Sequence, residues 1–106
     1  DEFAMEKGIK AQVQIDGETG IVVVALSNSE DYMFPDDLGL ALLHPTQSKK
    51  DVKLLLSKGP DGRYYSELLE PLSDGRWYFR VSEANWRLQK LINWPSANSF
   101  ELNSNS

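Results

Sequence analysis

Two Asp-Gly-Arg turns, each followed by an aromatic-rich run, constrain the fold of this chain more than any other feature. The first opens residues 61–69 (DGRYYSELL) and the second opens residues 74–81 (DGRWYFRV). An Asp-Gly pair supplies the positive φ angle of a tight turn, and aromatic and β-branched residues in period-two order suit a half-buried pleated surface. Two antiparallel strands are therefore expected to begin at these turns.

Further strands are indicated by alternating or β-branched runs along the chain. Apolar and polar residues alternate over 9–15, which predicts a strand with one wet face. Residues 21–26 (IVVVAL) predict a central strand buried on both faces. The other expected strands cover 38–44, 52–57, 63–69, 76–82 and 85–94. Seven to eight short strands separated by turn signals favour an all-β fold, an immunoglobulin-like antiparallel β-sandwich.

The 106 residues are the length of one domain, which we expect to span residues 8–95. Residues 1–7 (DEFAMEK) are interpreted as a disordered or cloning-derived leader, and residues 96–106 as a polar, frayed tail. Residues 27–37 form a polar loop interrupted by Tyr32, Met33 and Phe34. We expect the apolar middle of this loop to pack onto the core.

Composition excludes several classes of function. With 11 basic and 16 acidic residues the net charge is −5, which argues against nucleic acid or an anionic membrane surface as a partner. The chain has no cysteine, which excludes disulfides, thiolate catalysis and cysteine-ligated metal clusters. Its longest apolar run falls well short of the roughly 18–20 residues of a membrane span. The chain is therefore expected to be a soluble piece of a longer protein.

His44 is the only histidine and the first candidate for chemistry. It suits a metal ligand or a general base, but a base needs a reacting partner in place. A copper(I) site formed by His44, Met33 and Met5 has ligands that suit this ion. The competing interpretation, which we favour, makes His44 a strand-end residue bonded to a neighbouring loop and the methionines packing material. No catalytic set is found, so the protein is expected not to be an enzyme.

A partner-contact patch is predicted from the register of the strand at 76–82. Trp77 and Phe79 share a parity that should point inward, so Tyr78 and Arg80 face outward. Arg87 lies on the outward parity of the next strand. Because Tyr and Arg are enriched at interfaces, we predict that Tyr78, Arg80 and Arg87 contact a protein partner. Exposed aromatic residues also stack on sugars, so a carbohydrate-binding β-sandwich is an alternative.

Four segments together resemble the FixH/CcoH family in their order and spacing. They are residues 40–46 (LALLHPT), 61–64 (DGRY), 72–78 (LSDGRWY) and 86–89 (WRLQ). The alternating opening at 10–17 (KAQVQIDG) is also similar, and the resemblance covers roughly residues 8–94. One departure is Lys90, at a position where many members carry glycine.

The resemblance implies a periplasmic β-sandwich behind one N-terminal transmembrane helix. Family members are encoded with a copper-transporting P-type ATPase and assist assembly or stabilisation of the cbb3-type cytochrome c oxidase. By this resemblance the chain is the periplasmic domain of an inner-membrane-anchored accessory protein in a Gram-negative bacterium. Its anchor would lie upstream, and its partners would be oxidase subunits or the ATPase.

The resemblance implies no catalytic residue and no cofactor, because the family has no agreed catalytic motif. Copper is the one ion that its gene neighbourhood suggests. A copper-binding accessory domain linked to the ATPase is therefore the alternative to a domain that acts through protein contacts.

Overall fold

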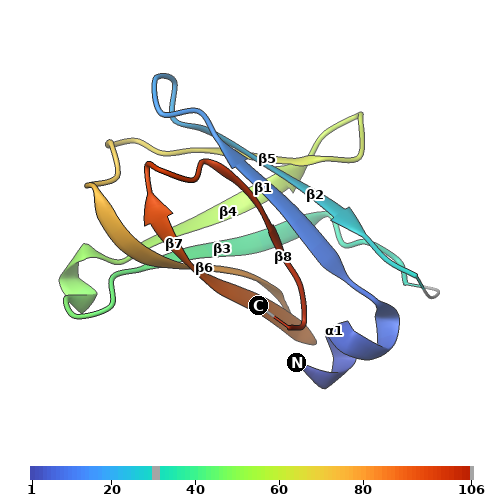
Figure 1. Ribbon diagram of the computed structural model, residues 1–106. Helices are drawn as coiled ribbons and strands as arrows, with labels where there is room; N and C mark the ends of the chain where they lie inside the picture. The colour runs from blue at the N-terminus through green and yellow to red at the C-terminus, as the bar shows by residue number, and fades with distance from the viewer. Residues whose placement is uncertain (30–31, 106) are drawn as a thin grey trace.

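The computed structural model describes residues 1–29 and 32–105, and these residues form an all-β fold of eight strands (Figure 1). The elements are α1 (Glu2–Lys7), β1 (Lys10–Ile15), β2 (Ile21–Ser27), β3 (Asp37–Leu43), the 3-10 turn η1 (Ser48–Lys50), β4 (Val52–Lys58), β5 (Tyr64–Glu67), β6 (Gly75–Glu83), β7 (Trp86–Trp94) and β8 (Ser99–Leu102). The predicted fold class is confirmed, and each expected strand has its counterpart.

The eight strands form one nearly closed sheet in the order β7-β6-β3-β4-β5-β2-β1-β8, with every neighbouring pair antiparallel. The β4–β5 ladder is short, with Ser57 opposite Tyr65 and Lys58 opposite Tyr64. This short ladder joins two four-stranded halves, which face each other in two layers (Figure 1). The finer expectation of an immunoglobulin-like arrangement stays a prediction.

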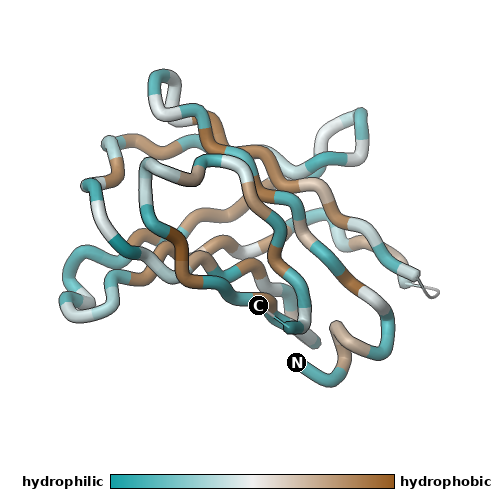
Figure 2. The backbone as a smooth tube through the Cα atoms, in the orientation of Figure 1, coloured by the Kyte–Doolittle hydropathy of each residue, from teal (hydrophilic) through white to brown (hydrophobic). Residues whose placement is uncertain are grey.

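The core lies between the two halves and is entirely apolar among the described residues. Successive strand residues alternate between this core and solvent. Figure 2 shows that hydrophobic residues recur along the strands. Trp77, Phe79 and Val81 of β6 point inward, as their parity predicts. Phe79 meets Phe100 of β8 edge to face, with ring centroids 4.9 Å apart. This contact joins the two layers.

β2 differs from its prediction as a strand buried on both faces. Val22 and Val24 are fully buried, but Ile21 is 45% exposed and Val23 is only half-buried. The strand is internal because β1 and β5 flank it in the sheet. β2 is therefore hydrogen-bonded along both edges, whereas only one of its two faces is buried in the core.

Residues 2–7 form the helix α1 rather than a disordered leader. The Asp1 carboxylate accepts a hydrogen bond from the Ala4 N–H at 3.1 Å and caps the first turn. Gly8, in the left-handed conformation at φ 62°, ends the helix. Ala4 is fully buried, so the helix is attached to the core. Both capping residues were visible in the sequence.

The C-terminal segment also differs from the expected frayed tail, because Ser99–Leu102 forms β8. It pairs with β1, with Phe100 opposite Val13 and Leu102 opposite Ala11. Phe100 and Leu102 are buried. The polar composition of the tail hid this pair of apolar residues with strand spacing.

β7 and β8 are the two edge strands of the sheet, and the side chain of Lys90 on β7 reaches towards β8. Lys90 pairs with Phe79 and so has the register of a core-facing residue. Its side chain is nevertheless exposed, and its Nζ donates to the Glu101 carbonyl oxygen of β8 at 3.4 Å. The register of β7 is thus continuous through this lysine.

No described helix is long and apolar enough to cross a membrane.

Tyr64 gives the fold a dependence on alkaline pH. Its side chain is fully buried, and its hydroxyl donates to the Pro35 carbonyl oxygen. Burial, with smaller contributions from Tyr32, Asp36 and Asp37, raises the pKa of Tyr64 to about 12. An unfolded tyrosine has a pKa of about 10. The folded state therefore holds this proton more tightly, and its stabilisation is present below about pH 10 and lost as the pH rises towards 12.

We expect Tyr64→Phe to remove this part of the pH dependence. Urea midpoints of the wild type and the variant, measured near pH 8 and near pH 11, test it. The wild type should lose more stability between the two pH values than the variant. Equal losses in both proteins would mean that Tyr64 does not control the alkaline transition.

Candidate functional site

The outer surface of β7, β6, β3 and β4 is more basic than the rest of the chain, and we call it the basic face. Its outward positions are Arg87, Gln89, Leu91 and Asn93 of β7, Arg76, Tyr78, Arg80 and Ser82 of β6, Asp37, Gly39, Ala41 and Leu43 of β3, and Lys53, Leu55 and Ser57 of β4. Four of these residues are Arg or Lys and one is Asp, although acidic residues outnumber basic ones 16 to 11 in the whole chain.

Tyr78, Arg80 and Arg87, the predicted contact residues, all lie on the basic face. Tyr78 and Arg80 are two residues apart on β6 and are half-buried, whereas Arg87 on β7 is exposed. Arg80 pairs with Gln89, so Arg87 is its diagonal neighbour across the two strands. Diagonal neighbours on a sheet lie roughly 7–8 Å apart, within reach of long side chains. The three side chains therefore form one cluster.

Arg80 is held in place by its neighbour on β7. Its Nε donates to the Gln89 Oε1 at 2.8 Å. This bond uses one of the five guanidinium N–H groups. A cavity of about 380 Å³ borders the pair and is lined by Asp1, Arg80, Arg87, Leu88, Gln89, Asn103 and Ser104. The fixed guanidinium at this cavity can receive a carboxylate or a carbonyl oxygen.

Apolar side chains cross the basic face beside these cations. Leu91, Tyr78 and Leu43 are successive cross-strand neighbours and form a row of half-buried side chains. Leu55 of β4 is 67% exposed and lies opposite Gly39, which has no side chain to cover it. Apolar and cationic groups on one surface are typical of protein interfaces. Leu55 was not among the contact residues predicted from the sequence, although its outward parity on β4 is a signal that could have identified it.

His44 follows β3 and has a structural role in the next turn. Its Nδ1 accepts hydrogen bonds from the backbone N–H groups of Thr46 at 3.2 Å and Gln47 at 3.0 Å. The ring also meets Trp77 edge to face, with centroids 5.1 Å apart. Because Nδ1 is occupied, only Nε2 remains for a metal or a proton transfer. The interpretation of His44 as a residue bonded to the neighbouring loop matches this geometry.

The two methionines of the suggested copper site do not join His44. Met33 precedes β3 and is 91% exposed, whereas His44 follows the other end of the same strand. The seven residues of β3 separate the two side chains by roughly 20 Å. Met5 lies on α1 and is also exposed. Within residues 1–29 and 32–105, no group of three or more His, Asp or Glu side chains could hold a metal ion.

In the loop before β3, the side chain of Tyr32 packs against the core as expected, whereas the side chain of Met33 is exposed to solvent. Tyr32 contacts Phe3 and Trp86 edge to face, with centroids 6.0 and 6.3 Å away. The Trp86 indole N–H also donates to the Tyr32 hydroxyl at 2.6 Å. One aromatic residue therefore fastens the loop to α1 and β7, while the adjacent methionine stays in solvent.

Fold and surface together define a small all-β domain with a basic, partly apolar outer sheet face. The chain belongs to the FixH family, whose sequence model matches residues 1–93. The match includes β1 to β6 and the segment with Tyr78, Arg80 and Arg87. No curated protein and no solved structure is significantly similar to the chain.

Proposed function

We propose that this domain is a non-enzymatic accessory domain that assists assembly or stabilisation of the cbb3-type cytochrome c oxidase by protein contacts. The observation that carries this proposal is membership of the FixH family over residues 1–93. In the same proposal, the domain lies in the periplasm of a Gram-negative bacterium and is tethered by a membrane anchor upstream of this chain.

The basic face is the proposed contact surface. It combines fixed and flexible guanidinium groups with an apolar row, and Tyr and Arg are the residues that most often dominate binding energy. The outward strand positions of the other half provide a contrast, since they include one basic residue, Lys10, and two acidic residues, Glu67 and Glu101. A partner surface with exposed carboxylates fits the basic face best.

Affinity purification of the full-length, membrane-anchored protein in mild detergent tests the proposal. We expect oxidase subunits to co-purify with the wild type. The double variant Arg80→Glu/Arg87→Glu should recover at least about tenfold less oxidase, because reversing two charges at an interface opposes a carboxylate-bearing partner. Urea midpoints of both proteins establish that the variant still folds.

A matched control distinguishes an effect of the basic face from an effect of the overall net charge. The variant Lys10→Glu/Arg63→Glu changes the net charge by the same amount at exposed positions outside the basic face. It should recover oxidase as the wild type does. Absence of oxidase subunits from the wild-type eluate would overturn the proposed function. Equal recovery with both double variants would overturn the contact face alone.

A further inference from the structure

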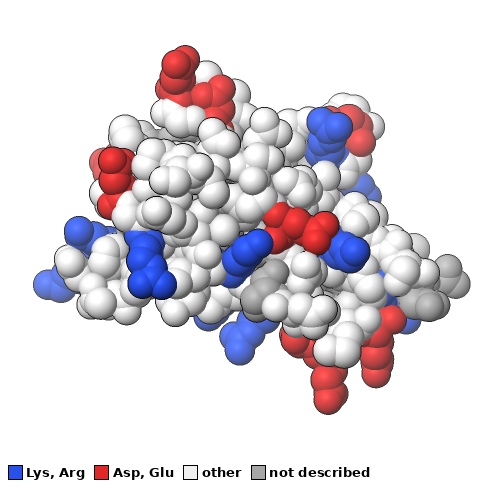
Figure 3. Space-filling view, in the orientation of Figure 1, with Lys and Arg blue, Asp and Glu red and all other residues white. Residues whose placement is uncertain are grey.

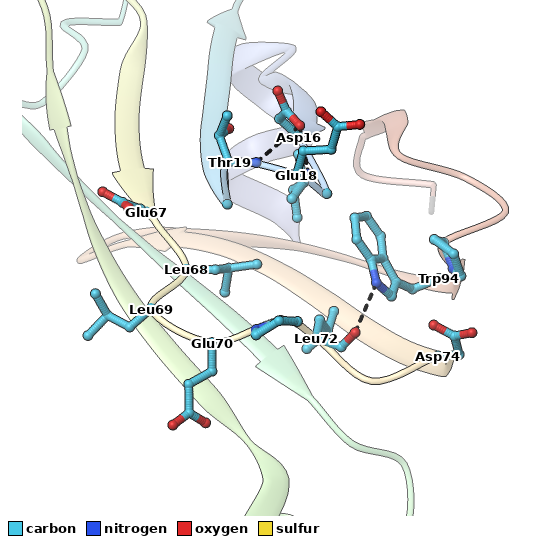
Figure 4. Close-up of a pocket in the computed structure, with 15 residues that line it drawn as sticks. Asp16, Glu18, Thr19, Glu67, Leu68, Leu69, Glu70, Leu72, Asp74 and Trp94 are labelled. Atoms are coloured by element: carbon cyan, nitrogen blue, oxygen red, sulfur yellow. Dashed lines mark hydrogen bonds between the residues drawn. The ribbon is translucent and has the colours of Figure 1, made fainter.

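A second surface feature lies at the end of the fold where the β1–β2 turn approaches the β5–β6 segment and the end of β7. The cavity there has a volume of about 520 Å³. It is lined by residues 15–20, 67–72, 74 and 94–95 (Figure 4). We call it the end cavity. Its size is within the usual range of roughly 300–1,000 Å³ for ligand pockets.

The walls of the end cavity are fixed by hydrogen bonds. The Leu68 N–H donates to the Gly20 carbonyl oxygen at 2.8 Å, which joins the β5–β6 segment to the β1–β2 turn. Gly20 has a φ of +77°, and a Cβ there would lie 2.6 Å from the Leu68 carbonyl oxygen. On the other side, the Trp94 indole N–H donates to the Leu72 carbonyl oxygen at 3.2 Å. The cavity is thus formed before any ligand arrives.

The floor of the end cavity is apolar. Leu68, Leu72 and Trp94 are largely buried, and Figure 4 shows the Leu68 side chain directed towards the Trp94 indole. Leu69 points away from this floor and is 92% exposed beside the cavity. An apolar floor of this size accepts one or two apolar side chains rather than a charged group.

The rim of the end cavity is acidic. Five of the lining residues are carboxylates and none is Lys or Arg; the five are Asp16, Glu18, Glu67, Glu70 and Asp74. Figure 3 shows carboxylates over the β1–β2 turn and over the β5–β6 segment, with uncharged surface between them. Hydrogen bonds from the Glu18 and Thr19 N–H groups hold the pKa of Asp16 below its usual value. These hydrogen bonds therefore favour the charged form of Asp16.

We propose that the end cavity binds a basic segment of a partner polypeptide, which inserts one apolar side chain between Leu68, Leu72 and Trp94. The acidic rim attracts Lys and Arg residues that flank the inserted side chain, and it repels acidic segments. The apolar floor distinguishes such a segment from a polyamine, which offers charge without an apolar anchor. This site shares no residue with the basic face and does not depend on the oxidase as partner.

Binding of short peptides to the 106-residue chain, followed by NMR of the tryptophan indole N–H groups, tests the proposal. The peptide KKLKK should shift the Trp94 signal in a saturable manner, because this indole forms part of the floor. Trp86 lies at the other end of the fold and should not respond. The peptide KKSKK and spermidine should bind several-fold more weakly, and EELEE should not bind.

Paired variants test the acidic rim. Glu18→Gln/Glu70→Gln removes two exposed rim charges and should weaken KKLKK binding about fivefold. Glu2→Gln/Glu6→Gln removes two exposed charges from α1 and should bind as the wild type does. Equal weakening in both variants would reduce the effect to net charge and overturn the proposal. So would a Trp94 signal that stays unchanged at millimolar KKLKK, or an equal response to KKSKK or spermidine.

Discussion

Trp77→Ala is expected to lower the free energy of unfolding by about 3–5 kcal/mol. The Trp77 side chain is 2% exposed in the core, near the start of β6, which lies between β3 and β7. Its indole N–H donates to the Ser73 carbonyl oxygen at 2.9 Å, and its ring contacts His44. The substitution therefore leaves a large cavity and removes a hydrogen bond. Urea denaturation followed by circular dichroism measures the loss.

Tyr78→Ala is the matched control, because Tyr78 is the next residue of the same strand on the opposite face. Its removal should cost much less than that of Trp77, since its side chain is only half-buried. Similar midpoints for the wild type and Trp77→Ala would contradict the inward register of β6. They would also remove the basis for placing Tyr78 and Arg80 on an outer face.

Phe100→Ala is expected to cost about 3 kcal/mol of unfolding free energy. The ring is buried and meets Phe79 of the opposite layer, so its loss opens the contact between β8 and β6. Urea denaturation is again the measurement. This result would distinguish a C-terminal strand from a frayed tail, in which the same substitution would change nothing.

Glu101→Ala is the control for β8, since Glu101 is exposed and points away from the core. Its side chain should contribute less than about 0.5 kcal/mol. A midpoint for Phe100→Ala that coincides with that of Glu101→Ala would show that the core closes without this strand.

The inward and outward faces of the long strands could be predicted because their side chains strictly alternate. Trp77 and Phe79 point inward as their spacing requires. The same rule places Tyr78 and Arg80 outward, and it also sets Leu55 of β4 on the opposite parity from Leu54 and Leu56. Family membership could be predicted as well, because four segments of the chain resemble the family in their order and spacing. The family match over residues 1–93 confirms this prediction.

Short terminal elements could not be predicted from composition, since their stability depends on the rest of the fold. α1 has only six residues, too few to be stable alone, and buries Ala4 against the domain. β8 has four residues, and its pairing with β1 spans most of the sequence. Residues 21–26 of β2 are all apolar, so the sequence does not indicate which face of this strand meets solvent. Tertiary packing decides each of these cases.

The end cavity was missed for a related reason. The lining residues, 15–20, 67–72 with 74, and 94–95, lie in three segments far apart in the sequence. Each segment taken alone is typical of an ordinary turn, in which Asp16 and Asp74 each precede a glycine. Their common charge becomes significant when the hydrogen bond between Gly20 and Leu68 brings the segments together.

The position of Lys90 affects how copies of this domain behave towards one another. A free strand edge offers unpaired backbone groups on which a neighbouring molecule can extend the sheet. Lys90 places an ammonium group in the opening between the β7 and β8 edges, where it donates to the Glu101 carbonyl oxygen. A strand arriving from another copy would have to displace this group and strip it of water, which is costly. The lysine therefore disfavours extension of the sheet by another strand at this opening.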